Sequence, residues 1–142
     1  MYLHIIKIIF SIICYDIWFY ISHIILHHEY FYKYHKKHHK KLNPTFIDTY
    51  TGHFLEGPFQ GLGMVLSFIL IKYSIIERII VLLLINLRGM MRHDERFTFL
   101  IGNHHLLHHK YPKYNYGEYW LDYIGTTKYP HNDEYKRGLI YL

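Results

Sequence analysis

The chain has 142 residues, a formal net charge of +5 and 14 histidines. A chain of this length is expected to form one domain around one core. Its single cysteine, Cys14, excludes an internal disulfide, a CxxC redox pair and an iron–sulfur cluster held by cysteines. Any metal would therefore be bound through nitrogen and oxygen. The sequence carries no GxGxxG fingerprint, P-loop or CxxCH haem motif, so electrons for any redox chemistry would have to come from another molecule.

The first predicted element is an apolar helix over residues 5–26. It is long enough to cross a membrane, for which about 20 apolar residues suffice. A signal peptide and a soluble core helix are the alternatives. No small-residue cleavage site is present, and Asp16, Tyr20, His23 and His27 recur at helical spacing along one stripe. We therefore expect a membrane helix whose polar stripe leads out of the bilayer toward a metal site.

The next segment, residues 29–41, alternates tyrosine, histidine and lysine, and Pro44 follows it. The residue before a proline avoids the helical region, so this segment should end there. It carries an HxxHH motif formed by His35, His38 and His39. Positions i, i+3 and i+4 share one face of a helix, so the sequence predicts that these three imidazoles converge on one point.

A second apolar stretch covers residues 62–87 and contains three charged residues near its middle. In one straight membrane span each charge would cost roughly 2.5–3.5 kcal/mol. A single crossing would also place the histidines before and after it on opposite sides of the bilayer. We therefore predict a helical hairpin with arms at 62–71 and 75–87 and a turn near 72–74. Each arm is shorter than a full span, so the hairpin either crosses the membrane or only dips into it.

The chain after the hairpin is expected to return to the metal site. Arg88-Gly89 should end the hairpin helix, and His93 follows as an isolated central histidine. Asn103 is a favourable N-cap for a short helix over residues 104–111. This helix carries an HHxxHH motif formed by His104, His105, His108 and His109. The glycine-rich and aromatic segment from 115 to 127 is expected to pack under the metal-binding helices.

Three spaced histidine motifs in one short chain, HxxxH, HxxHH and HHxxHH, predict a metal site. Scattered, solvated histidines are the alternative. At about four or five imidazoles per ion, the candidate ligands would suffice for two metals. Neutral imidazole suits iron, zinc, copper and nickel, so the ligand type alone does not name the metal.

The order of these motifs resembles the fatty acid hydroxylase superfamily, which includes sterol desaturases and C4-methylsterol oxidases. The resemblance covers about residues 16–126. It includes the DxxxYxxH pattern that begins at Asp16, the pair His53-x2-Glu56, which is similar to the HPxE element of the family, and the Asn115-Tyr116-Gly117 segment.

This resemblance implies an all-α integral membrane helical bundle with a cytosolic, histidine-rich helical cap that holds a dimetal site. Residues 1–142 would form a single domain, with the cap built from residues 23–56 and 88–127. Carried over by position, the resemblance implies these metal ligands: His23, His27, His35, His38, His39, His53, His93, His105, His108 and His109.

The resemblance also implies an activity. The chain would hold two iron ions, with zinc as a possible substitute, and would use O2 as co-substrate to hydroxylate or desaturate a fatty acyl or sterol C–H bond. Electrons would come from a separate cytochrome b5-like donor or reductase. The protein would lie in an endoplasmic reticulum-type membrane with its histidine motifs facing the cytosol.

Carboxylates near the motifs could orient the imidazole N–H groups, as such groups do at many metal sites. The candidates are Asp16, Glu56, Asp94 and Asp122, and Tyr20 could contribute its hydroxyl. Ordinary helix capping and surface ion pairing are the alternatives for each carboxylate.

Two other functions are weighed against an oxygenase. A catalytically inactive relative could bind zinc structurally, because zinc fills closed four-coordinate sites and has no redox chemistry. Interleaved tyrosines and lysines are compatible with a nucleic-acid surface. The histidine motifs and the two long apolar runs argue against that interpretation, so we expect no nucleic-acid partner.

Overall fold

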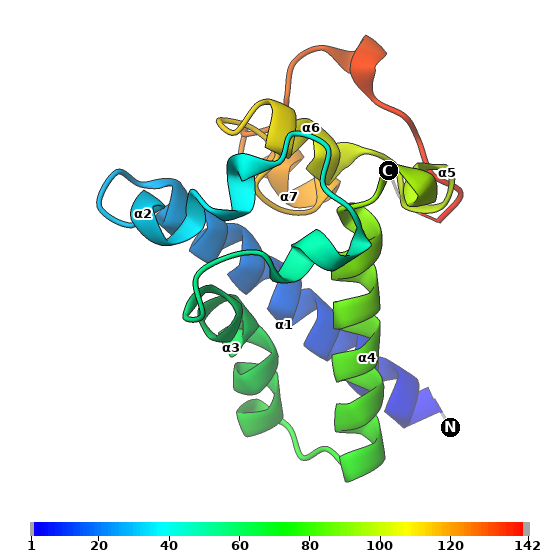
Figure 1. Ribbon diagram of the computed structural model, residues 1–142. Coiled ribbons are helices and arrows are strands. Elements are labelled where there is room, and N and C mark those ends of the chain that lie inside the picture. Colours follow the sequence, from blue (N-terminus) through cyan, green and yellow to red (C-terminus); the bar gives the residue numbers. More distant parts are fainter. Residues whose placement is uncertain (1, 141–142) are drawn as a thin grey trace.

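The computed structural model describes residues 2–140, and every regular element in that range is a helix (Figure 1). The α-helices are α1 Tyr2–His27, α2 Tyr32–His35, α3 Glu56–Leu70, α4 Ile75–Arg92, α5 Thr98–Ile101, α6 His104–Lys110 and α7 Tyr119–Ile124. Short 3₁₀ helices lie at His38–Lys40, Phe46–Tyr50, Glu95–Phe97 and Asn132–Glu134. The predicted all-α fold is confirmed.

Three long helices form one end of the molecule and the short helices gather at the other (Figure 1). Both α3 and α4 pack against α1, and much less against each other. The turn between α3 and α4 lies beside the N-terminal part of α1. There the Lys7 ammonium donates to the Lys72 carbonyl at 2.9 Å and the Tyr73 hydroxyl donates to the Lys7 carbonyl at 2.9 Å. The histidine-rich segments therefore lie at the opposite end of the long helices.

Helix α1 has the length and composition of a membrane span. It has 26 residues and is apolar enough to cross a membrane, and it would be about 39 Å long at 1.5 Å per residue. Among the described residues it is the one helix that meets both criteria. Its outward face is a stripe of exposed isoleucines at positions 5, 9, 13, 17, 21 and 24, while its inward face buries mostly polar or small side chains.

Helix α3 approaches α1 closely at Gly63. A Cβ atom at this position would lie 2.5 Å from the Cβ of Trp18 and 2.8 Å from the carbonyl oxygen of Cys14. One turn further, the buried hydroxyls of Ser67 and Ser11 hydrogen-bond with 2.5 Å between their oxygens. Small residues at a helix interface allow such close backbone approach, so they set the distance between α1 and α3.

Replacing Gly63 by alanine should force α1 and α3 apart and lower the free energy of unfolding by about 1–3 kcal/mol, the usual cost of overpacking. Gly61→Ala is a matched control on the same helix, because a Cβ there meets nothing within 4 Å. That variant should gain up to about 1 kcal/mol from helix propensity. Thermal unfolding of the purified chain in detergent measures both, and equal melting temperatures for the two variants would contradict this packing.

The predicted hairpin is present, but its arms are longer than expected. Helix α3 begins at Glu56 rather than at 62, and α4 continues through Gly89 to Arg92. The expectation that Arg88-Gly89 ends this helix is wrong. Gly89 stays helical, and its carbonyl oxygen accepts a hydrogen bond from Nδ1 of His93 at 2.7 Å. The extra turn of α4 is what carries His93 to the other histidines.

The charged residues in the middle of the second apolar stretch lie at and just after the hairpin turn. The Ser74 hydroxyl accepts from the Glu77 backbone N–H at 3.2 Å, and the Glu77 carboxylate accepts from the Ser74 N–H at 2.5 Å. This reciprocal pair is a capping box that starts α4. The Glu77 carboxylate also contacts His4 at 2.8 Å and Lys7 at 3.4 Å. These polar groups thus lie at the end of the bundle remote from the histidine-rich segments.

Asn103 occupies the predicted N-cap position of α6, but its side chain makes no capping hydrogen bond. Its amide donates to the Glu134 carbonyl at 2.9 Å, and its side-chain oxygen accepts from the Lys136 backbone N–H at 2.8 Å. The capping hydrogen bond is absent because the C-terminal segment engages the same amide. Asn103 therefore ties that segment to the start of α6.

Candidate metal centre

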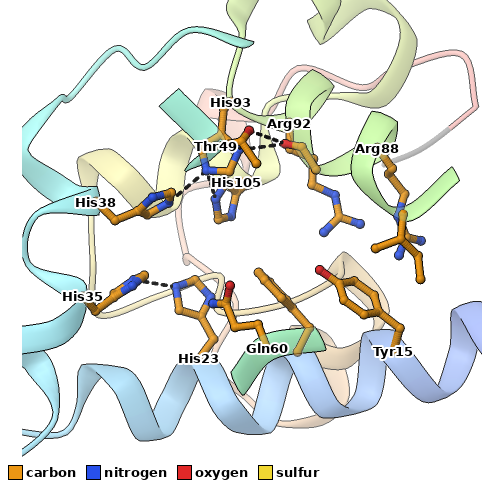
Figure 2. A pocket seen from close by; sticks show the side chains of 13 residues that line it. Tyr15, His23, His35, His38, Thr49, Gln60, Arg88, Arg92, His93 and His105 are labelled. Atoms are coloured by element: carbon orange, nitrogen blue, oxygen red, sulfur yellow. Dashed lines mark hydrogen bonds between the residues drawn. The ribbon is translucent and has the colours of Figure 1, made fainter. Parts of the chain in front are cut away.

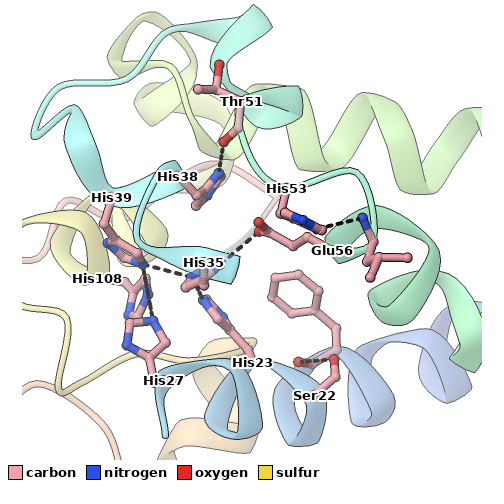
Figure 3. Close-up of polar contacts among 12 residues, drawn as sticks. Ser22, His23, His27, His35, His38, His39, Thr51, His53, Glu56 and His108 are labelled. Atoms are coloured by element: carbon pink, nitrogen blue, oxygen red, sulfur yellow. Dashed lines mark hydrogen bonds and ion pairs between the residues drawn. The ribbon is translucent and has the colours of Figure 1, made fainter. Parts of the chain in front are cut away.

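Nine histidines gather at one end of the long helices in two groups, within each of which the candidate ligand nitrogens lie within 4.8 Å of one another. The five-histidine group contains His23, His27, His35, His39 and His108. The four-histidine group contains His38, His93, His105 and His109. The rings come from α1, α2, the 3₁₀ helix after α2, the end of α4 and α6 (Figures 2 and 3).

Two of the sequence motifs are divided between the two groups. His35 and His39 belong to the five-histidine group, whereas His38 belongs to the four-histidine group. The motif on α6 divides in the same way. His105 and His109 belong to the four-histidine group, whereas His108 belongs to the five-histidine group. The prediction that the imidazoles of the HxxHH motif converge on one point is wrong, and those of the motif on α6 do not converge either, whereas His23 and His27 of the HxxxH motif lie in the same group. The chain leaves the α-helical path after His35 and resumes as a 3₁₀ helix at His38, which turns His38 toward α4.

Backbone carbonyls fix the proton positions on two rings of the five-histidine group. Nδ1 of His23 donates to the Tyr116 carbonyl at 2.5 Å, and Nδ1 of His108 donates to the Tyr114 carbonyl at 2.6 Å. A carbonyl oxygen can only accept, so each Nδ1 carries the proton and each Nε2 keeps a lone pair. Both rings are therefore held in the tautomer that can bind a metal through Nε2.

The four-histidine group is held in the same way. Nδ1 of His38 donates to the Thr51 carbonyl at 3.1 Å, and Nδ1 of His93 donates to the Gly89 carbonyl at 2.7 Å (Figures 2 and 3). The Thr49 hydroxyl also lies 2.9 Å from this nitrogen of His93. Their Nε2 atoms therefore also carry lone pairs.

These lone pairs face one another at short distances. The Nε2 atoms of His38 and His93 are 2.9 Å apart. Those of His23 and His35 are 3.0 Å apart, and Nδ1 of His35 lies 2.8 Å from the Glu56 carboxylate, which takes the place of a backbone carbonyl. A neutral imidazole has one N–H, so with the protons on Nδ1 no hydrogen bond can join these atoms. Two nitrogens bound to one ion at about 2.1 Å and at right angles would lie about 3.0 Å apart. The spacing therefore fits a metal ion in each group.

The two ring nitrogens of His109 give independent support for a metal ion in the four-histidine group. Both nitrogens are buried and have no hydrogen-bond partner among the described residues. Leaving a buried nitrogen unpaired costs about 1–3 kcal/mol. His109 belongs to the four-histidine group, so a bond from one of its nitrogens to a metal would offset part of this cost.

Burial keeps the ligand rings neutral. Desolvation, with neighbouring histidines adding to it, lowers the pKa of His35 to about 3 and of His39 to about 2. The same causes lower the pKa of His93 to about 3 and hold the pKa of His108 well below its usual range. Metal binding requires the neutral imidazole, so the site is prepared for metal at neutral pH.

Acid should therefore destabilise the metal-free chain. Between the usual pKa of 6.5 and the folded value of about 3 for His35, the unfolded state binds more protons than the folded state. The stability contribution is complete above the usual pKa and is lost as the pH falls through this window. The melting temperature should fall steadily from about pH 7 to about pH 5. A melting temperature that does not change over this range would contradict burial of neutral rings.

Glu56 is the one predicted carboxylate that contacts a ligand directly. Its Oε1 accepts from Nδ1 of His35 at 2.8 Å, and the residue is only 7 % exposed (Figure 3). Burial raises the pKa of this carboxyl to about 7 in the metal-free chain. Its Oε2 lies against Gly52, where any side-chain Cβ would overlap it. Glycine at 52 therefore leaves room for the contact between Glu56 and His35.

The other predicted carboxylates act elsewhere. Asp16 pairs with Arg88, and Asp94 pairs with Arg96 at 2.6 Å, so neither contacts a ligand. Their prediction as partners of imidazole N–H groups is wrong, because arginine lies closer to each. The Tyr20 hydroxyl lies 3.0 Å from the Thr127 hydroxyl rather than beside a ligand.

Asp122 acts indirectly, through the backbone. Its carboxylate lies 2.9 Å from Nε2 of His104 and accepts from the backbone N–H groups of Tyr116 and Gly117 at 2.8 Å each. It therefore fixes the loop whose Tyr116 carbonyl holds His23. His104 belongs to this supporting network and to neither histidine group.

His53 lies outside both groups. Its Nδ1 accepts from the Leu55 backbone N–H at 3.3 Å, and its ring packs against Tyr34 and Phe54 at centroid distances of 4.9 and 4.6 Å. Helix α3 begins three residues later at Glu56, and the turn before it directs His53 outward and Glu56 inward. The structure thus brings together nine of the ten predicted ligands and not His53.

The carbonyl acceptors were missed from sequence because every residue has a carbonyl. One signal was available at Asn115, which is buried and has a positive φ of 58°. Asparagine tolerates this left-handed conformation better than most residues. The resulting bend presents the carbonyls of Tyr114 and Tyr116 to His108 and His23.

A cavity of about 60 Å³ lies between the two groups (Figure 2). Five ligand rings line it, two from the five-histidine group and three from the four-histidine group: His23, His35, His38, His93 and His105. The opposite wall includes Tyr15, Phe19, Gln60 and Ile85. A space of this size holds a small molecule or one short part of a larger one, next to both histidine groups.

Comparison with known proteins identifies a family whose profile matches this chain. The profile of the fatty acid hydroxylase family matches residues 8–127, a range that contains every histidine of both groups. Neither a curated protein nor a solved structure matches the chain. The profile match extends over most of the sequence and includes the whole candidate centre. The chain therefore belongs to the fatty acid hydroxylase family.

Proposed function

We propose that this chain is a membrane-bound, iron-dependent oxidoreductase that uses O2 and external electrons to hydroxylate or desaturate a lipid. Family membership makes it an oxidoreductase that acts on lipids. The observation that supports the metal-dependent part is the meeting of Nε2 lone pairs at 2.9 and 3.0 Å without a proton between them. The two histidine groups would each hold one iron.

Iron is favoured over zinc by the ligand count. A structural zinc site closes with four ligands, whereas one group here offers five imidazoles. Iron accepts more nitrogen ligands and undergoes redox change, and neutral imidazole suits it. Bound iron would supply the activation of O2 and the oxidising power needed to attack an unactivated C–H bond.

The residues of the chain orient the ligands and exclude water. The carbonyls of Tyr114 and Tyr116 and the Glu56 carboxylate keep the protons of three rings on Nδ1. Phe19 and Ile85 line the cavity between the two groups, so the reacting carbon would sit away from bulk water. The sequence carries no nucleotide, flavin or haem c motif, so we propose that a separate cytochrome b5-like donor or reductase supplies the electrons.

We further propose that the three long helices lie in an endoplasmic reticulum-type membrane, with the histidine end in the cytosol. Large apolar side chains on α3 and α4 are exposed, among them Leu66, Ile69, Ile76, Ile79 and Leu83. Soluble monomers rarely expose such continuous apolar surface. Exposed lysines, including Lys36 and Lys37, lie at the histidine end, and lysines flanking membrane helices favour the cytosolic side.

Cysteine labelling tests this topology. In a Cys14→Ser background, single cysteines at Asn43 and Tyr111 should react with an impermeant reagent from the same side of the membrane. A cysteine at Ser74 should react from the opposite side if the hairpin crosses fully, because Ser74 lies at the turn remote from the histidines. Labelling of positions 43 and 111 from opposite sides would exclude a shared metal centre.

Lipid analysis tests the function itself. Lipid extracts of cells with and without the chain are compared under ¹⁸O2. We expect a lipid that gains one labelled oxygen or loses two hydrogens only when the chain is expressed. A lipid profile that the iron-loaded protein leaves unchanged in the presence of an electron donor would contradict the proposal.

A further inference from the structure

A groove of about 490 Å³ lies beside the five-histidine group, apart from the cavity between the two groups. It is bounded by the end of α1, the start of α2 and the beginning of α3. Its lining is almost entirely apolar and includes Ile25, Leu26, Phe31, Pro58, Phe59 and Leu62. Its volume falls within the range of about 300–1,000 Å³ that is usual for pockets that enclose small organic ligands.

The inner wall of this groove touches the metal centre. Glu56 lines the groove, and its carboxylate accepts the hydrogen bond from His35 at 2.8 Å. His35 in turn lines the cavity between the histidine groups. The contact between these two side chains therefore lies where the groove and the cavity come closest, and any molecule in the groove lies one residue away from a candidate metal ligand.

The mouth of the groove opens onto apolar surface. Phe31, Leu55 and Leu62 are 47 %, 50 % and 41 % exposed. The exposed isoleucine stripe of α1 and the outer face of α3 continue from this point along the long helices. If these faces lie in a bilayer, the groove is open to hydrocarbon chains and closed to water-soluble ligands.

The cavity is too small for a whole lipid, so most of such a substrate would lie outside it. At about 60 Å³, it can admit only the reacting part of a lipid. Two other pockets of the described chain are lined by charged side chains, among them Lys128 and Arg137 in one and Lys110 and Glu134 in the other. Their charged and polar lining suits a lipid chain less well than the almost entirely apolar lining of the groove.

We propose that this groove binds the acyl chain of the lipid substrate and holds it against the Glu56 side of the five-histidine group. The proposal rests on the proposed function for the identity of the substrate. An acyl chain suits the groove because it needs no hydrogen-bond partner. The carboxylate in the wall already accepts from His35, so it is not free to bind a polar headgroup through that oxygen.

Photo-crosslinking tests the groove without turnover. The full chain in phosphatidylcholine nanodiscs is irradiated with a fatty acid that carries a diazirine on its chain, and labelled peptides are mapped by mass spectrometry. We expect label on the groove residues around Phe31 and Phe59. Leu62→Trp, which fills the groove, should lower this labelling about tenfold. Leu66→Trp is the matched control, because Leu66 is on the same helix, is 47 % exposed and does not line the groove.

A second groove variant shows whether a loss of labelling comes from misfolding. Phe31 lies at the mouth of the groove and is half exposed, so Phe31→Ser should keep the wild-type metal content and still lose labelling. Label spread evenly over the outer faces of α1 and α4, or unchanged in both groove variants, would overturn the proposal. So would a sterol diazirine that labels the groove more strongly than the acyl probe.

The groove and the oxygenase activity can fail separately. His108→Ala should keep the acyl labelling, because His108 does not line the groove, while it loses turnover. Groove labelling without any oxidised lipid would reject the proposed function and support the groove. Oxidised lipid without groove labelling would reject the groove alone.

Discussion

Replacing His108 by alanine should remove the metal from the five-histidine group and abolish lipid oxidation. Nε2 of His108 lies 3.1 Å from Nε2 of both His27 and His39, so this ring is central to the group. The ring is fully buried and its Nδ1 is anchored by the Tyr114 carbonyl. Loss of groups that merely orient a ligand costs about 10–100-fold in affinity or activity, so loss of a ligand should cost more than about 100-fold.

Metal analysis and product formation measure this effect together. The iron content should fall from two ions to one per chain, because the four-histidine group keeps all its members. His28→Ala is the control: His28 is exposed, its ring stacks on Tyr30 and it belongs to neither group. A His108→Ala variant that keeps both its metal content and its turnover would reject the assignment.

Removing the Glu56 carboxylate should lower the metal affinity of the five-histidine group, although Glu56 is not itself a member of that group. In Glu56→Ala, Nδ1 of His35 loses its acceptor, and an unpaired buried N–H costs about 1–3 kcal/mol. The ring is then free to change tautomer or rotate. Metal affinity of the five-histidine group should fall about 10–100-fold, as measured by competition with a chelator. Glu56→Gln keeps an acceptor oxygen and should fall less.

Two comparisons separate this positioning role from general destabilisation. The four-histidine group should retain its metal in Glu56→Ala, because Glu56 bonds none of its members. Gly52→Ala should reproduce part of the effect, since its Cβ would displace the carboxylate. Equal loss of metal from both groups would show that Glu56 supports the fold rather than His35.

Local patterns in the sequence predicted the elements and the nine residues of the two histidine groups. The polar stripe of α1 and the position of the hairpin turn follow from residue type and spacing. The charges of the second apolar stretch were correctly placed at a turn, although the capping box of Ser74 and Glu77 that explains them was not foreseen. The histidine motifs identified nine residues that meet in space.

Contacts between segments that are distant in the sequence could not be predicted from such local patterns. His38 and His35 share one motif but lie in different groups, because α2 ends between them and His38 turns toward the end of α4. His53 and Glu56 look equally suited to the centre, yet the start of α3 decides which one points inward. Asn103 has the residue type of a cap but is engaged by the C-terminal segment.

The metal content of the purified chain tests the central claim most directly. Protein made in cells supplied with ⁵⁷Fe is examined by elemental analysis and Mössbauer spectroscopy. We predict two irons per chain, one for each histidine group, both bound by nitrogen and oxygen and both oxidised when O2 is added to the reduced protein. A single tightly held zinc per chain, with no iron and no reaction with O2, would contradict the oxygenase and favour a structural zinc protein.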